Sequence, residues 1–162
     1  MVEPTDAPDE IERAIIALAS TLPDTNESWT EALGQGLCDL GNARNYYVSS
    51  SHSQLHHDGG REWLFDHAWT ETGVKGIRSV PLALESELAD WGDQGIDHDF
   101  QKLLTTRARH RVMLFCGRDV ERQFSRLIEQ VREFEDTRPG DRYLLLGFEG
   151  TDYKLKPRVF VA

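Results

Sequence analysis

The chain has 162 residues, of which 39% are apolar and 28% charged, and its formal net charge at pH 7 is −10. These values predict one globular domain that buries roughly 70% of its unfolded surface. The longest apolar run near the start, 14–19, is too short to span a membrane, and no basic segment precedes it. We therefore expect a cytoplasmic protein without a secretory signal, in which Cys38 and Cys116 are reduced core thiols.

The first part of the chain predicts two helices. Residues 1–8 are acidic and contain prolines, so they are expected to lack order and the folded domain is predicted to span 9–162. The spacing of apolar residues predicts a helix over 9–21. The sequence Ser28-Trp29-Thr30-Glu31 has the pattern of a capping box, which predicts that a second helix begins there and covers 28–40.

A strand and a polar loop are predicted next. Residues 44–50 are typical of a strand, and the stretch 49–60 is typical of a loop or hairpin tip. The loop carries His56, His57 and Asp58, which could bind zinc or act as a base. Adjacent histidines point in different directions, so a solvated loop is the simpler interpretation.

The remaining elements predict a mixed α/β sheet with helices on its faces. The predicted strands are 61–68, 78–88, 110–116, 142–149 and 155–161. The predicted helices are 97–108 and a longer one that begins after its cap, Asp119. The turn-rich segment 71–76 joins the first two of these strands, and the last two are expected to pair as a hairpin.

Acidic side chains stand near the ends of two of these strands, which are otherwise apolar. Asp66 follows an apolar pair in the first, and Glu85 and Glu87 share a strand face with Ala83 in the second. If the two strands are neighbours, three carboxylates converge. Each like-charge pair about 4 Å apart costs roughly 4 kcal/mol at an effective dielectric of about 20. A hard divalent cation with oxygen ligands is the ordinary way to offset that cost.

An acid on one strand, an acid-x-acid pair on the next and a lysine on the following helix resemble the PD-(D/E)xK nuclease superfamily. The resemblance covers roughly 28–116, whose predicted elements follow the α-β-β-β-α-β order of that superfamily. It implies a restriction endonuclease-like core with an added N-terminal helix and an added C-terminal helix plus hairpin. The usual lysine of the third strand is replaced by Glu87, and Lys102 on the next helix is the substitute that the resemblance implies.

The resemblance implies a hydrolase that cleaves phosphodiester bonds, with DNA as the substrate and Mg²⁺ or Mn²⁺ as the cofactor. Asp66 and Glu85 would hold the metal, and Glu87 would orient water or bind a second ion. Lys102 would position the water or stabilise the transition state. This assignment requires the Asp66 and Glu85 carboxylates to lie on one sheet face, within about 6 Å of each other.

Two further acids are secondary candidates for a metal-linked carboxylate. Glu31 lies on the predicted second helix, where its place in the capping box already explains it. Glu62 shares a strand face with Asp66 and is an equal rival.

The main candidates also have structural interpretations. Asp66 could cap the turn that follows its strand. Glu85 and Glu87 could lie on an exposed sheet face, and Pro81 is compatible with an edge strand. Lys102 could form an exposed i,i+3 pair with Asp99.

The net charge of −10 opposes a nucleic-acid ligand, because phosphate binding usually requires a basic face. The charge is uneven, however, since six arginines lie within 107–126. Two alternatives therefore stay open: a catalytically degenerate nuclease-fold module that binds or regulates, and an adaptor whose acidic face mimics DNA. A homodimer or a protein partner is left open as well.

Overall fold

The computed structural model describes residues 5–22, 26–50, 64–89 and 91–162. In these residues the chain forms, in order, α1 (Glu10–Ser20), α2 (Asn26–Asn42), β1 (Tyr47–Ser50), β2 (His67–Gly73), β3 (Gly76–Glu87), α3 (Asp93–Thr105), β4 (His110–Gly117), α4 (Val120–Glu133), β5 (Arg142–Glu149) and β6 (Lys154–Val161). Within that part of the chain, no helix has the length and apolar character needed to cross a bilayer.

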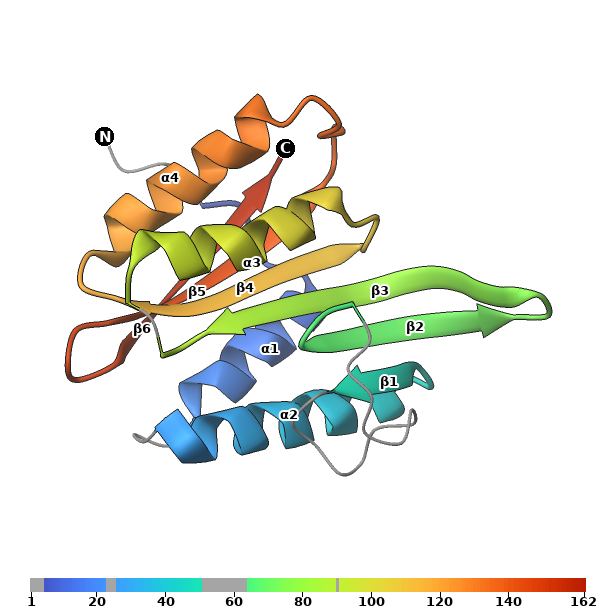
Figure 1. The fold of residues 1–162 in the computed structure, drawn as a ribbon. Helices are drawn as coiled ribbons and strands as arrows, with labels where there is room; N and C mark the ends of the chain where they lie inside the picture. The colour runs from blue at the N-terminus through green and yellow to red at the C-terminus, as the bar shows by residue number, and fades with distance from the viewer. Residues whose placement is uncertain (1–4, 23–25, 51–63, 90) are drawn as a thin grey trace.

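The strands of the described chain form one six-stranded mixed sheet in the order β1-β2-β3-β4-β5-β6. The pairs β1–β2, β2–β3 and β5–β6 are antiparallel, and β3–β4 and β4–β5 are parallel. Helices α1 and α2 cover one face of the sheet, and α3 and α4 cover the other (Figure 1). The predicted α/β class, a mixed sheet flanked by helices, is confirmed.

Two helices begin at acidic caps. At α1, Asp9 accepts a hydrogen bond from the Glu12 N–H, and the Glu12 carboxylate accepts one from the Asp9 N–H, which completes a capping box. At α4, the predicted cap Asp119 accepts a hydrogen bond from the first turn. The predicted start of the second helix is wrong: α2 begins at Asn26, so Ser28 lies inside it.

The two central strands explain where the core lies. β4 is buried along its whole length, as its nearly continuous apolar sequence predicts. β3 lies between β2 and β4 rather than at an edge, although it contains Pro81. The β2–β3 ladder shifts register between Trp69 and Glu71, and a bulge of this kind accommodates a residue that cannot donate a ladder hydrogen bond.

The β2–β3 hairpin differs most from its predicted boundaries. β2 begins at His67 instead of 61 and continues to Gly73, and only Val74 and Lys75 turn the chain into β3. The polar and glycine-bearing sequence at 71–76 predicted a long turn, but cross-strand pairing extends through it. The hairpin therefore projects well beyond the helices (Figure 1).

Candidate active site

β2 and β3 bring Asp66 and Glu85 to the same place on the sheet. His67 pairs with Leu84 in the antiparallel register, so Asp66, one residue earlier, lies across from Glu85. Cross-strand partners share a sheet face. Here that face is the one covered by α3 and α4, because Ala68 and Ala83, two residues along on each strand, belong to the core on that side.

α3 places Lys102 over this pair. The Lys102 Nζ lies 2.8 Å from Glu85 Oε2 and 3.1 Å from Asp99 Oδ1. The Glu85 side chain is 1% exposed and the Lys102 side chain 35% exposed. The lysine thus forms the predicted i,i+3 pair with Asp99 and, at the same time, reaches from a partly exposed helix position to a buried carboxylate.

The burial of Glu85 controls its protonation. Burial raises the pKa of Glu85 to about 8, the Lys102 ammonium opposes the shift, and the charges of Asp66 and Asp99 add to it. Burial alone would lower the pKa of Lys102, but its contacts with Glu85 and Asp99 outweigh that effect and raise it. Glu85 therefore becomes charged at a much higher pH than an ordinary glutamate does.

The burial of Glu85 is only partly compensated. Oε2 lies 2.8 Å from Lys102 Nζ, but both carboxylate oxygens are buried and neither has a hydrogen bond of good geometry among the described residues. A buried polar atom in that condition costs about 1–3 kcal/mol. Most buried polar atoms in folded proteins have a partner, so the Glu85 carboxylate is an exception that needs an explanation.

Asp66 is held in place by the residue that follows Glu85. Its Oδ2 accepts hydrogen bonds from both the N–H and the hydroxyl of Ser86, each at 2.9 Å. The carboxylate is therefore fixed against β3 beside Glu85, although Asp66 itself precedes the first residue of β2.

The other predicted acids have different surroundings. Glu87 Oε1 accepts a hydrogen bond from the Ala89 N–H at 3.0 Å. Burial raises the pKa of the Cys116 thiol to about 12, and the Glu87 charge adds to that shift. Glu31 is exposed on α2, which covers the opposite face of the sheet. Glu62 and the loop residues His56, His57 and Asp58 lie outside the described residues.

Asp99 belongs to the cluster and was predicted only as a surface partner of Lys102. Its spacing from the lysine is visible in the sequence, but a helix sequence does not show which strand the pair covers. The observed cluster therefore contains Glu85 and Asp99, both in contact with the Lys102 ammonium, and Asp66, whose charge acts on Glu85.

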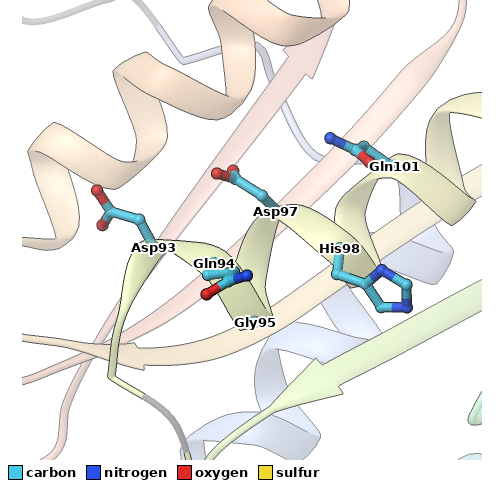
Figure 2. Close-up of a pocket in the computed structure, with 6 residues that line it drawn as sticks. All are labelled: Asp93, Gln94, Gly95, Asp97, His98 and Gln101. Atoms are coloured by element: carbon cyan, nitrogen blue, oxygen red, sulfur yellow. The ribbon is translucent and has the colours of Figure 1, made fainter.

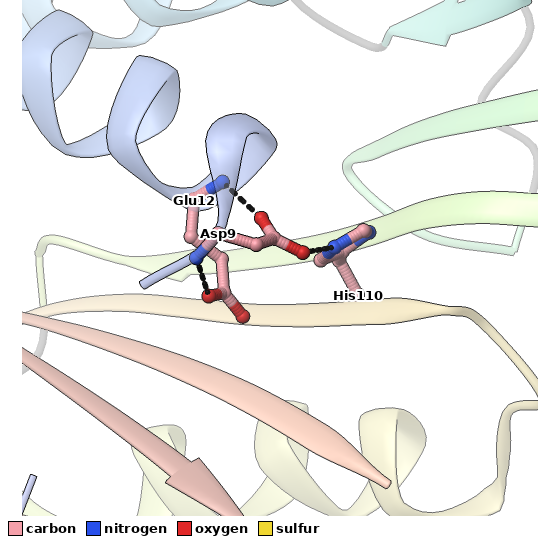
Figure 3. A group of neighbouring side chains, drawn as sticks. All are labelled: Asp9, Glu12 and His110. Atoms are coloured by element: carbon pink, nitrogen blue, oxygen red, sulfur yellow. Dashed lines mark hydrogen bonds and ion pairs between the residues drawn. The ribbon is translucent and has the colours of Figure 1, made fainter. Parts of the chain in front are cut away.

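A second group of side chains has metal-ligand geometry. Within the described ranges, the ligand atoms of Asp9, Glu12 and His110 lie within 4.8 Å of one another (Figure 3). These atoms already have partners. Glu12 accepts two hydrogen bonds from Arg142, at 3.0 and 2.6 Å, and Asp9 Oδ2 lies 2.7 Å from His110 Nε2.

The hydrogen-bond contacts of His110 also oppose a metal. Its Nδ1 lies 3.1 Å from the Pro81 carbonyl oxygen, which can only accept, and its Nε2 faces the Asp9 carboxylate. Both ring nitrogens are therefore already in contact with oxygen atoms, and a metal ligand would have to give up one of these contacts. Burial alone would raise the pKa of Asp9, but the Glu12 N–H and His110 outweigh it and keep that pKa low.

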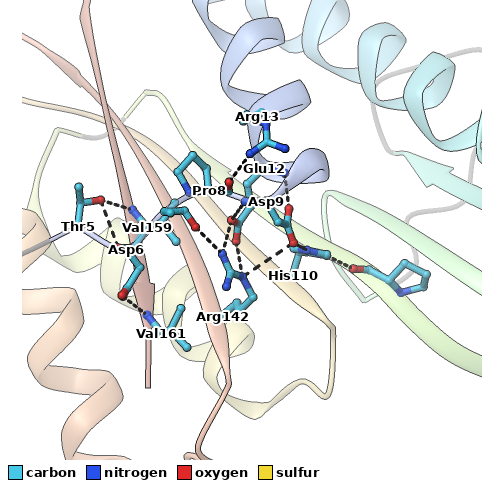
Figure 4. A network of polar contacts seen from close by, with 12 residues as sticks. Thr5, Asp6, Pro8, Asp9, Glu12, Arg13, His110, Arg142, Val159 and Val161 are labelled. Atoms are coloured by element: carbon cyan, nitrogen blue, oxygen red, sulfur yellow. Dashed lines mark hydrogen bonds and ion pairs between the residues drawn. The ribbon is translucent and has the colours of Figure 1, made fainter.

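This group ties the N-terminal segment to the sheet (Figure 4). The Asp6 N–H donates to the Val159 carbonyl, and the Asp6 carboxylate accepts a hydrogen bond from the Val161 N–H. Thr5 to Pro8, within the segment expected to lack order, thus lie along β6. We assign Asp9, Glu12 and His110 to the structure of the domain.

A hollow on α3 is lined by Asp93, Gln94, Gly95, Asp97, His98 and Gln101 (Figure 2). Its two carboxylates point toward α4, where Asp93 pairs with Arg122 and Asp97 pairs with Arg126. Hydrogen bonds from Arg122 and Gln123 lower the pKa of Asp93 to about 2. These acids join two helices and are already neutralised, so the hollow carries no chemistry.

No family model, no curated protein and no solved structure matches this chain. Its function is therefore inferred from its own side chains.

Proposed function

We propose that this protein is a divalent-metal-dependent nuclease that hydrolyses phosphodiester bonds, with DNA as the expected substrate. The observation that carries the proposal is that Asp66, just before β2, lies across from Glu85 on β3, which Lys102 on α3 contacts. The surrounding elements occur in the order α2-β1-β2-β3-α3-β4, which is the order that the PD-(D/E)xK resemblance requires.

The acids suit a hard cation. Neither carboxylate oxygen of Glu85 has a hydrogen bond of good geometry among the described residues, and Ser86 fixes the Asp66 carboxylate across from Glu85. Asp66 and Glu85 would hold Mg²⁺ or Mn²⁺, which when bound would neutralise charge on the phosphate and lower the pKa of a water ligand. Because burial raises the pKa of Glu85 to about 8, metal binding there should release a proton and strengthen as the pH rises.

Lys102 supplies the positive charge that does not depend on metal. Its raised pKa keeps it an ammonium at neutral pH, and its partial exposure allows contact with a phosphate oxygen. A preorganised cation of this kind stabilises charge that develops in the transition state. Asp99 holds the ammonium from the solvent side, so we assign it as a positioning residue. That Glu87 orients water stays a prediction.

A second candidate function is a degenerate nuclease-fold module that binds or regulates. The contact between Lys102 and Glu85 favours this candidate as well. A protonated Glu85 beside Lys102 offsets much of the negative charge of the cluster, so the cluster does not require a metal. Calorimetric titration with Mn²⁺ distinguishes the two. Binding that is lost in Asp66→Asn supports the nuclease, and no binding to the wild type supports the module.

Cleavage itself tests the proposal. Supercoiled plasmid and a labelled linear duplex are incubated with Mg²⁺ or EDTA, using wild type, Asp66→Asn, Glu85→Gln and the control Glu129→Gln. Glu129 is an exposed acid on α4, away from the cluster. We expect Mg²⁺-dependent cleavage by the wild type and the control, and loss of cleavage in the other two variants. Equal cleavage by all four proteins would remove the assignment.

A further inference from the structure

The β2–β3 hairpin ends in an exposed tip whose composition differs from the rest of the chain. Residues 72–78 contain two basic side chains, Lys75 and Arg78, and no acidic one, in a protein of net charge −10. The acid next along the ribbon, Glu71, pairs with Ser79. All residues from 72 to 78 are exposed. Val74 is fully exposed and Ile77 is 53% exposed. Exposed aliphatic residues beside cations, at the end of a projecting ribbon, indicate a contact surface.

The tip is a tight and defined structure. Gly73 pairs with Gly76, so Val74 and Lys75 alone make the turn. Gly76 has φ +127°, a conformation that residues with a Cβ rarely adopt. Val74 and Lys75 are thus presented by the turn itself, and Ile77 and Arg78 follow on opposite faces of the ribbon.

We propose that the β2–β3 hairpin is an arm that enters a groove of duplex nucleic acid, with Lys75 and Arg78 against phosphates and Val74 and Ile77 against the groove wall. The width of a two-stranded ribbon suits the major groove of B-DNA. Single strands are usually held by stacking on aromatic rings, and residues 72–80 contain none. The inference builds on the proposed nuclease function, and it is tested by binding, independently of cleavage.

The arm and the acids belong to the same hairpin, so their separation is fixed. Seven residue steps separate Asp66 from Gly73, so at ~3.3 Å per step the tip lies roughly 23 Å from the acids. That is about two-thirds of the ~34 Å turn of B-DNA. A duplex cleaved at the acids would therefore meet the tip up to roughly seven base pairs away, at ~3.4 Å per pair.

Fluorescence anisotropy with a labelled duplex of about 30 base pairs, in EDTA so that nothing is cleaved, tests the arm. The variant is Lys75→Glu/Arg78→Glu. The matched control, Lys154→Glu/Arg138→Glu, makes the same charge change at exposed positions near β5 and β6, the opposite end of the sheet. We expect the arm variant to bind the duplex roughly tenfold more weakly, or weaker still. The slope of log K against the logarithm of the salt concentration should become less steep by roughly 1.8, about 0.9 for each lost phosphate contact.

Three results would overturn the inference: no duplex binding by the wild type, equal losses in arm and control variants, or unchanged affinity in the arm variant. If the arm variant sediments with a lower mass than the wild type but binds the duplex equally well, the arm contacts a second copy of the chain instead. Val74→Ser/Ile77→Ser keeps the charge and should also weaken binding, without changing the salt slope. If the arm binds duplex but Mg²⁺ gives no cleavage, the nuclease proposal fails and the arm stands.

Discussion

Lys102 Nζ lies 2.8 Å from Glu85 Oε2, which joins a partly exposed position on α3 to the buried interior of β3. Asp99 also contacts this ammonium, and the charges of Asp66 and Asp99 add to the raised pKa of Glu85. A proton on Glu85 offsets part of the excess negative charge. A divalent cation would offset it once that proton leaves.

The protonation of Glu85 should make stability depend on pH. Its pKa rises from the ordinary 4.5 to about 8 on folding, so its contribution is full below pH 4.5 and is lost as pH rises toward 8. Over that window the wild type should lose up to about 1.4 kcal/mol per pH unit relative to Glu85→Gln. Urea unfolding of both proteins at pH 5, 6.5 and 8.5 measures the difference, and parallel stabilities across the range would exclude the shift.

Removing Lys102 should separate catalysis from folding. Lys102→Ala should lower the cleavage rate by roughly 10²–10³-fold, the scale of losing one preorganised transition-state contact. At pH 6 its free energy of unfolding should change little, because Glu85 is neutral there. At pH 9 the loss should be larger, because a buried carboxylate is left unpaired. Lys154→Ala, at an exposed position on β6, is the control, and normal cleavage by Lys102→Ala would make Lys102 a structural residue.

Asp99 should act through its neighbours. The Asp99 charge adds to the raised pKa of Glu85, so Asp99→Asn should lower that pKa and shift the rising limb of the pH–rate profile to lower pH. A variant that only weakened the fold would lower the rate without moving the profile. Initial rates in Mg²⁺ between pH 6 and 9 make the comparison, and an unmoved limb would leave Asp99 outside the site.

The network of Asp9, Glu12 and His110 should respond to mutation as a structural element. Asp9→Ala removes the cap of α1 and the partner of His110, so it should lower the free energy of unfolding by about 1–2 kcal/mol. Zn²⁺ or Mn²⁺ should bind the wild type and Asp9→Ala equally. Metal binding that disappears in Asp9→Ala would show instead that these three residues hold an ion.

Much of the fold follows from local sequence. The apolar stripe of α4 with its Asp119 cap and the continuous apolar run of β4 are both found as predicted. The start of β2 and the length of the hairpin are not, because cross-strand pairing overrides the turn propensity of residues 71–76. The start of α2 at Asn26 shows in the same way that a capping-box pattern can lie inside a helix.

Only part of the candidate site follows from local sequence. Strand alternation can place Asp66 and Glu85 on one face once their strands pair. It cannot show that the Glu87 carboxylate accepts a hydrogen bond from the Ala89 N–H, because that depends on how the chain leaves β3. The contact between Lys102 and Glu85 depends on which strand α3 covers, and only the family resemblance suggested it. The pairing of Asp9 with His110 joins residues 101 positions apart, beyond the reach of any local pattern.

Anomalous diffraction from crystals soaked in Mn²⁺ at pH 8.5, where Glu85 can ionise, tests the central claim most directly. We predict a manganese peak within ~2.6 Å of both the Asp66 and Glu85 carboxylates, with Lys102 moved away from Glu85 Oε2. A peak at Asp9, Glu12 and His110, or none near Asp66 and Glu85, would contradict the assignment of a metal-dependent nuclease site.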